Sequence, residues 1–269
     1  MGINVEPSGR RSIKVEFEVP GTPEEVWNAI GTAPGIASWF VPVTFDEENG
    51  KPVALTIHFA GGIEPRSAVT VYDPPRMYAT EADGWMPGSP PIASEWTVEA
   101  KGGGVCVVRI VQSLFASNAD WDNQLEAAKG GFASFLEILR IYLTHFRGQP
   151  ATFMKWTGSG KGAEAEAWDT FTQALGLGKM KVGQKWSAPA GLPAMSGVVE
   201  YATRDPFDAL IRLDTPGPGV AALGIAGYPG GPVMVAMHVY MYGEHGPATV
   251  TREQPRWEKW FQQNFPMSE

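Results

Sequence analysis

The sequence contains two copies of one pattern of secondary structure, and this internal repeat limits the fold more than any single motif. Residues 12–30 read as a strand-like run, a glycine-containing turn and a helix that carries Trp27. Residues 151–171 read in the same way, with Trp168 at the equivalent place in the helix. The repeat therefore predicts two copies of one structural unit.

A second pair of matching segments lies further along each copy. In residues 66–79 and again in residues 195–210, a strand ends in Tyr, and a proline-containing turn leads into another strand. A chain of 269 residues is long enough for two domains that each bury a core. We therefore expect one domain in residues 1–148 and a shorter one in residues 149–269.

Composition excludes several classes of partner. The chain has 21 Lys and Arg against 29 Asp and Glu, for a net charge of −8, so it has no basic excess to bind nucleic acid. No segment approaches the roughly 20 apolar residues of a membrane span, and the amino terminus lacks the apolar core of a signal peptide. The single cysteine, Cys106, lies between valines and is expected to be a buried structural thiol. These features favour a cytoplasmic protein with no membrane insertion.

The first copy has clear local signals for strands and a short helix. Ile13 to Val19 alternates apolar and charged residues, as a strand with one wet face does. The segment Thr22 to Glu25 supplies an N-cap, a first-turn proline and a capping-box glutamate. A second helical turn is expected up to Phe40. Six further strands are then predicted: Val41 to Phe45, Val53 to Phe59, Ala68 to Tyr72, Arg76 to Thr80, Ile92 to Glu99 and Val105 to Gln112.

The first copy ends in a long amphipathic helix, predicted from Ala119 to His145. Its apolar stripe has spacings of three and four and consists of Trp121, Leu125, Ala128, Phe132, Phe135, Leu139, Tyr142 and Phe146. A coiled-coil partner could explain this stripe, but the preceding strands need a cover, and a helix across a curved sheet provides it. Two glycines in the middle, Gly130 and Gly131, each cost about 1 kcal/mol relative to Ala and indicate close backbone approach or a kink.

The second copy is predicted to be shorter. Its Gly-rich segment 158–162 lacks the Lys-Ser/Thr pair of a phosphate loop and reads as a strand-to-helix turn. A final helix is expected to begin with a capping box of Thr251 and Gln254, with Pro255 in its first turns. The other predicted elements are a helix at Ala165 to Leu175 and strands at Gly197 to Thr203, Ala209 to Asp214, Val220 to Ala226 and Val233 to Tyr242.

Four segments of the first copy carry a resemblance to a known family. They are residues 19–40, residues 69–81, Glu95 to Val98 with the following Gly102 to Gly104 turn, and residues 130–143. They resemble the START-like, or SRPBCC, helix-grip superfamily, and specifically the group homologous to the activator of the heat-shock-protein-90 ATPase. The second copy resembles a divergent, shortened member.

The resemblance implies an α+β helix-grip fold: a curved antiparallel sheet wrapped around a long C-terminal helix, present as two tandem copies. It also implies a cavity between the sheet and the long helix that holds a lipophilic small molecule. The full activators carry an additional chaperone-binding domain, and no segment of this sequence matches one.

The candidate cavity residues are apolar or aromatic side chains expected to face the space between sheet and helix, with one helical glycine. They are Trp39, Phe59, Trp85, Trp96, Gly131, Phe132, Phe135 and Leu139. Trp85 lies in a loop that either forms a lid over the pocket or packs its own Trp side chain. No catalytic residue, metal site or cofactor is predicted, because the four histidines lack metal-ligand spacing and the nucleophile and dinucleotide motifs are absent from the sequence.

Two questions stay open at this point. Glu95 and Arg109 either supply polar groups to the cavity or form cross-strand pairs on the solvated face, and pairing is the expectation. The leading hypothesis for function is a non-catalytic protein that binds a small hydrophobic molecule. The alternatives are a protein-interaction or co-chaperone-like module, with a partner chain or a second copy of itself, and a polyketide-cyclase-like or hydrolase-like enzyme.

Overall fold

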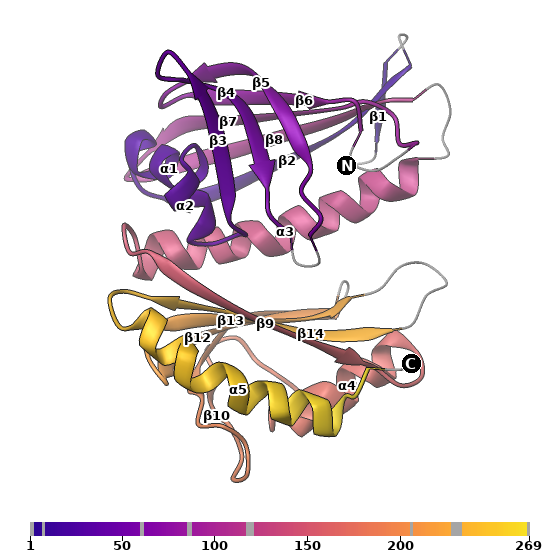
Figure 1. Ribbon diagram of the computed structural model, residues 1–269, viewed down its shortest axis with the longest axis vertical. Coiled ribbons are helices and arrows are strands. Elements are labelled where there is room, and N and C mark those ends of the chain that lie inside the picture. The colour runs from indigo at the N-terminus through magenta and orange to yellow at the C-terminus, as the bar shows by residue number, and fades with distance from the viewer. Residues whose placement is uncertain are drawn as a thin grey trace. The chain divides into compact units, whose positions relative to one another are not determined.

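The computed structural model describes residues 3–6, 9–59, 62–84, 88–116, 121–204, 207–226 and 233–267. The chain forms two compact units, Met1–Gly148 and Gln149–Glu269, each with its own sheet and helices (Figure 1).

The first unit is an antiparallel sheet with three helices. Its elements in chain order are β1 (Asn4–Val5), β2 (Arg10–Pro20), α1 (Pro23–Ile30), α2 (Ala33–Ala37), β3 (Val43–Glu48), β4 (Lys51–Ile57), β5 (Arg66–Asp73), β6 (Met77–Ala82), β7 (Ile92–Gly102), β8 (Val105–Phe115) and α3 (Asp122–His145). The eight strands pair in the order β1-β2-β8-β7-β6-β5-β4-β3. Strand β1 was not predicted, because two residues are too few for an alternation to be seen.

The turn into α1 has the capping box that its sequence predicts. The Thr22 hydroxyl accepts a hydrogen bond from the Glu25 amide at 3.3 Å, and the Glu25 carboxylate accepts one from the Thr22 amide at 2.8 Å. The same carboxylate lies 2.6 Å from the guanidinium of Arg147, which follows α3. The Thr22 amide, with Arg147, lowers the pKa of Glu25. This one side chain therefore joins the start of α1 to the end of the long helix.

The long helix α3 runs along the open side of the sheet (Figure 1). Its start is held by a salt bridge between Asp122 and Arg11 of β2. The predicted stripe is correct: Leu125, Leu139, Tyr142 and Phe146 are buried. Its middle members, Ala128, Phe132 and Phe135, are only partly buried. The helix therefore packs on the sheet at its two ends and less closely between them. Predicted positions 119 and 120 lie outside the described residues.

The two glycines of α3 do not mark a close approach, so that alternative was wrong, while a kink stays a prediction. A Cβ atom built at Gly130 or at Gly131 would meet no other atom within 4 Å. Neither residue needs to be glycine to avoid a clash with the sheet. At Gly131 the missing side chain instead leaves open space beside the helix.

Cys106 is a buried thiol, as predicted. It lies on β8 and its Sγ donates a hydrogen bond to the carbonyl of Gly21 at 3.3 Å. Burial raises the pKa of this thiol, with a smaller contribution from the carboxylates of Glu24 and Glu25. A thiol held neutral in this way is a packing group rather than a nucleophile.

The second unit is a smaller version of the same arrangement. Its elements are β9 (Ala151–Ser159), α4 (Glu164–Ala174), β10 (Lys185–Ser187), β11 (Ser196–Arg204), β12 (Phe207–Thr215), β13 (Gly219–Ala226), β14 (Met234–Tyr242) and α5 (Gly246–Asn264). Its six strands pair in the order β10-β11-β12-β13-β14-β9. The short strand β10 was not predicted.

Both units share one connectivity. In each, the first long strand lies beside the last one: β2 pairs with β8, and β9 pairs with β14, always antiparallel. A helix follows the last strand in each unit. The predicted fold class, a helix-grip fold in two tandem copies, is therefore confirmed.

Helix α5 differs from its prediction. It begins at Gly246 with Pro247 in its first turn, and Pro255 lies inside it. Thr251 is therefore an interior residue that donates to the Pro247 carbonyl, so the predicted capping box was wrong. The helix has 19 residues against 24 for α3. Burial of its aromatic face, which includes Trp257, offsets the hydrogen bond lost at Pro255.

The core of the second unit is filled by aromatic side chains. Trp156 of β9 stacks on Phe261 of α5, with ring centroids 6.2 Å apart and an interplanar angle of 13°. Gly158 lies directly under the carboxyl end of α5, because a Cβ atom there would come within 2.3 Å of the Phe265 carbonyl oxygen. Sheet and helix are therefore in close contact in this unit. None of the described helices has the length and apolar character needed to cross a bilayer.

Candidate ligand-binding cavity

The first unit contains a cavity of about 330 Å³ between its sheet and the helices α2 and α3. Gly131, Phe132 and Phe135 line it from α3, where the helix stripe is only partly buried. The strands, α2 and the loops next to them supply most of the remaining wall. Those residues are Ile36, Trp39, Phe40, Val43, Leu55, Ile57, Phe59, Pro65, Ser67, Tyr78, Thr80, Ala82, Gly84, Ile92, Ser94, Trp96 and Gln112, with Ala128 from α3.

Aromatic rings that contact one another form much of the wall. Trp96 of β7 stacks on Tyr78 of β6 with centroids 6.0 Å apart and planes 7° from parallel. Phe132 meets the Trp96 ring edge-on at 6.0 Å, and Trp39 lies 6.3 Å from it at a tilt. Such pairs contribute about 0.5–1.5 kcal/mol each beyond their buried area. The rings that face the cavity are therefore fixed by their neighbours.

The cavity is closed at one end by a buried side chain and is exposed to solvent on one side. Trp39 is only 3% exposed, and its indole nitrogen donates to the Ala29 carbonyl at 2.9 Å. Phe40 meets Phe135 edge-on at 4.6 Å and Phe59 at 6.1 Å. Phe59 is 38% exposed and is the most exposed of the lining residues. It therefore marks the rim, while Trp39 marks the closed end.

A short row of polar side chains crosses the sheet inside this apolar wall. Gln112 on β8 pairs with Ser94 on β7, which pairs with Thr80 on β6. Directly paired residues of antiparallel strands point to the same face, and all three line the cavity. Gln112 is 5% exposed, and its Oε1 has no hydrogen-bond partner among the described residues. A buried amide oxygen left in this state costs about 1–3 kcal/mol.

The described lining carries no ionisable side chain except one tyrosine. Asp, Glu, His, Lys, Arg and Cys do not occur among the residues that form this wall. Burial raises the pKa of Tyr78 far above its ordinary value, so its phenol stays neutral. The cavity therefore presents hydroxyl and amide groups but no charge.

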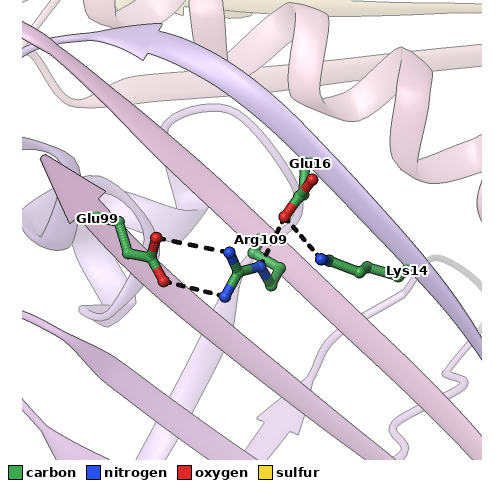
Figure 2. A network of polar contacts seen from close by, with 4 residues as sticks. All are labelled: Lys14, Glu16, Glu99 and Arg109. Atoms are coloured by element: carbon green, nitrogen blue, oxygen red, sulfur yellow. Dashed lines mark hydrogen bonds and ion pairs between the residues drawn. The ribbon is translucent and has the colours of Figure 1, made fainter. Parts of the chain in front are cut away.

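A cluster of charged residues lies on the other face of the sheet. Figure 2 shows Arg109 of β8 between Glu16 of β2 and Glu99 of β7, at 2.8 Å and 3.0 Å, with Lys14 2.8 Å from Glu16. Lys14, with Arg109, lowers the pKa of Glu16, while Glu16 is the main cause of the raised pKa of Arg109. Glu95 is also exposed on this face, one residue from Trp96. Arg109 therefore forms the expected cross-strand pairs, and neither it nor Glu95 lines the cavity.

The structure places the predicted cavity residues as follows. Trp39, Phe59, Trp96, Gly131, Phe132 and Phe135 all line the cavity. Leu139 is fully buried between α3 and the sheet but is not part of the lining. Trp85 lies outside the described residues.

Several lining residues that matter for the chemistry were missed, among them the polar Ser94 and Thr80. Phe40 was read only as the end of a helical turn, and Tyr78 only as part of a strand. Gln112 had a usable signal: it continues the inward series of Val108 and Ile110 on β8, and an amide at such a position is unusual.

The histidines do not contribute to the cavity. His58 lies near the rim strands but its Nδ1 is 3.0 Å from Glu64, away from the apolar face. His238 lies on β14 with its ring 5.6 Å from that of Phe153. Burial, with a smaller effect of Lys155, lowers the pKa of His238 to about 4. The described residues include no group of three or more His, Cys, Asp or Glu side chains that could hold a metal ion.

Comparison with known families identifies the first unit. The family model described as polyketide cyclase / dehydrase and lipid transport matches residues 10–143. The first unit belongs to this family, and the chain is a member of the SRPBCC superfamily. The superfamily inferred from the sequence is therefore confirmed. A comparison with curated proteins gave no match.

Several solved structures are similar to the chain. CalU16 from Micromonospora echinospora is 18% identical with a TM-score of 0.42, over 54% of this chain and 83% of that one. The di-domain ARO/CYC BexL from the BE-7585A biosynthetic pathway is 13% identical with a TM-score of 0.46, over 96% of this chain and 100% of that one. The Aha1 dimer from Colwellia psychrerythraea is 22% identical with a TM-score of 0.39, over 51% of this chain and 98% of that one.

Proposed function

We propose that this member of the SRPBCC superfamily is a non-catalytic binding protein that holds a small hydrophobic molecule in the cavity of its first unit. One observation carries the proposal: a cavity of about 330 Å³ remains between sheet and helix, with a wall of aromatic and aliphatic side chains and no charge in its described lining. This volume lies at the lower end of ligand pockets, which range over about 300–1,000 Å³.

The wall suits an apolar occupant for a simple energetic reason. Each Å² of apolar surface removed from water contributes about 25 cal/mol, so a molecule enclosed by this wall gains most of its affinity from burial. The rings of Trp96, Tyr78 and Trp39 are already held by stacking and by the indole hydrogen bond. A wall that is ordered before binding loses little side-chain freedom when the ligand enters.

The same lining favours binding over catalysis. The family description covers both cyclases or dehydrases and lipid transport. General acid-base chemistry needs a group whose pKa is near the working pH. The described wall offers only the neutral Tyr78 phenol and the uncharged Gln112, Ser94, Thr80 and Ser67. This composition supports the transport or storage kind of function.

The test is to compare native and denaturing mass spectra of freshly purified protein. A small apolar compound that is released on denaturation, and is then identified after organic extraction, would support the proposal and name the ligand class. A protein without such a compound would next be titrated with apolar aromatic probes. Failure to bind any of them at millimolar concentration would refute the proposal.

A further inference from the structure

We infer that the ligand of this cavity is a neutral molecule that carries a hydroxyl group on an otherwise apolar frame, and that Gln112 binds this hydroxyl. The inference rests on the proposed binding function and makes it more specific. It depends on two observations: the row of polar side chains formed by Gln112, Ser94 and Thr80, and the absence of charged side chains from the described wall.

The first step concerns the amide of Gln112. Its side chain is at least nine-tenths buried, it lines the cavity, and its Oε1 has no partner among the described residues. A buried polar atom in a folded protein is nearly always paired, so an unpaired one that faces a cavity calls for a partner inside that cavity. The partner of an amide oxygen is a hydrogen-bond donor, and a ligand hydroxyl is such a donor.

The second step concerns the neighbours of Gln112. Ser94 is its direct cross-strand partner on β7, and Thr80 is the partner of Ser94 on β6. Side chains in directly paired positions have Cβ atoms about 4.5–5.5 Å apart, close enough for one ligand oxygen to contact two of them. A hydroxyl both donates and accepts, so it can donate to Gln112 and accept from Ser94. A carbonyl group of a ligand can only accept.

The third step concerns charge. A carboxylate entering this wall would lose its hydration and find no Lys, Arg or His among the described lining residues to replace it. Fatty acids and other anions are therefore disfavoured. A plain hydrocarbon would enter but would leave Gln112 without a partner.

The experiment compares three probes that share one ring system: naphthalene, 2-naphthol and 2-naphthoate. Their dissociation constants are measured on the full chain from shifts of the Trp indole N–H signals. One hydrogen bond made in the cavity should give 2-naphthol about five- to tenfold higher affinity than naphthalene. 2-Naphthoate should bind at least tenfold more weakly than 2-naphthol.

Variants then assign the preference to one side chain. Gln112→Met keeps a long unbranched side chain and removes the amide, so the affinity ratio of 2-naphthol to naphthalene should fall to about one. Gln173→Met makes the same change at an exposed position of α4 and should keep the wild-type ratio. Because each ratio compares two probes on one variant, a change in stability does not affect it.

The outcomes separate this inference from the proposed function. Equal affinity of the wild type for naphthalene and 2-naphthol, or an unchanged ratio in Gln112→Met, would overturn the assignment of the hydroxyl while leaving a binding cavity in place. Tighter binding of 2-naphthoate than of 2-naphthol would overturn the neutral class. Failure of all three probes to bind would overturn the proposed function itself.

Discussion

Replacing Gly131 by leucine should fill part of the cavity without disturbing the protein around it. Gly131 lines the cavity from α3, and a Cβ atom there meets no other atom within 4 Å. The side chain therefore has room to enter. Gly130 is the matched control, because a Cβ atom there is equally unobstructed but this residue does not line the cavity.

Two contributions set the expected magnitude. Leucine at either position removes a helix-interior glycine, which stabilises the helix by about 1 kcal/mol. At position 131 the new side chain also leaves water for an apolar wall, which is worth about 1.5–3 kcal/mol. Gly131→Leu should therefore stabilise the first unit by about 3 kcal/mol and Gly130→Leu by about 1 kcal/mol. For a unit of this size each kcal/mol raises the melting temperature by about 3 °C.

Thermal unfolding and probe binding are measured on the same samples. Gly131→Leu should melt about 9 °C above the wild type and bind naphthalene at least tenfold more weakly, since the leucine takes part of the space. Gly130→Leu should melt about 3 °C higher and keep the wild-type affinity. If Gly131→Leu is less stable than Gly130→Leu, or binds naphthalene as the wild type does, the space beside the helix is not the ligand site.

Two further predictions concern the second unit. Gly158→Ala should destabilise it by about 2 kcal/mol or more in urea unfolding, because the added Cβ would lie 2.3 Å from the Phe265 carbonyl oxygen; an unchanged midpoint would contradict the close packing. In the folded protein His238 has a pKa of about 4, against an ordinary value of 6.5. Between pH 6.5 and pH 4 its imidazole is therefore protonated in the unfolded chain but neutral in the folded one. Stability should be full above pH 6.5 and fall as the pH drops toward 4. Between pH 7 and pH 5 the wild type should lose about 2 kcal/mol more than His238→Gln, and equal losses would contradict this pKa.

Local signals in the sequence predicted most elements of the fold. The capping box at Thr22 and Glu25 and the stripe of α3 depend on residues that are close together in the chain, and both are confirmed. The start of α5 was missed because Pro255 reads as a first-turn residue. Tertiary burial of Trp257 and its neighbours overrides that reading and extends the helix back to Gly246.

The cavity was less accessible to sequence reasoning than the elements around it. Alternation and helical spacing identified which faces of β7 and α3 point inward, and so they identified Trp96 and Phe132. They do not encode the separation between helix and sheet, which decides whether Leu139 fills the core or lines a space. The alternation of β8 marks Gln112 as an inward residue, but its place in a row with Ser94 and Thr80 depends on strand pairings that the sequence does not show.

The pairing of the first long strand with the last has a consequence for synthesis on the ribosome. Ile13 on β2 pairs with Gln112 on β8, and β8 is synthesised about 100 residues after β2. Strand β2 therefore cannot form this pairing until β8 has been made. At the usual rate of translation this takes roughly 5–20 s. During that time β2 is a free edge with an apolar face. The charged side chains of Lys14, Glu16 and Glu18, which alternate along this strand, then disfavour its pairing with other nascent chains.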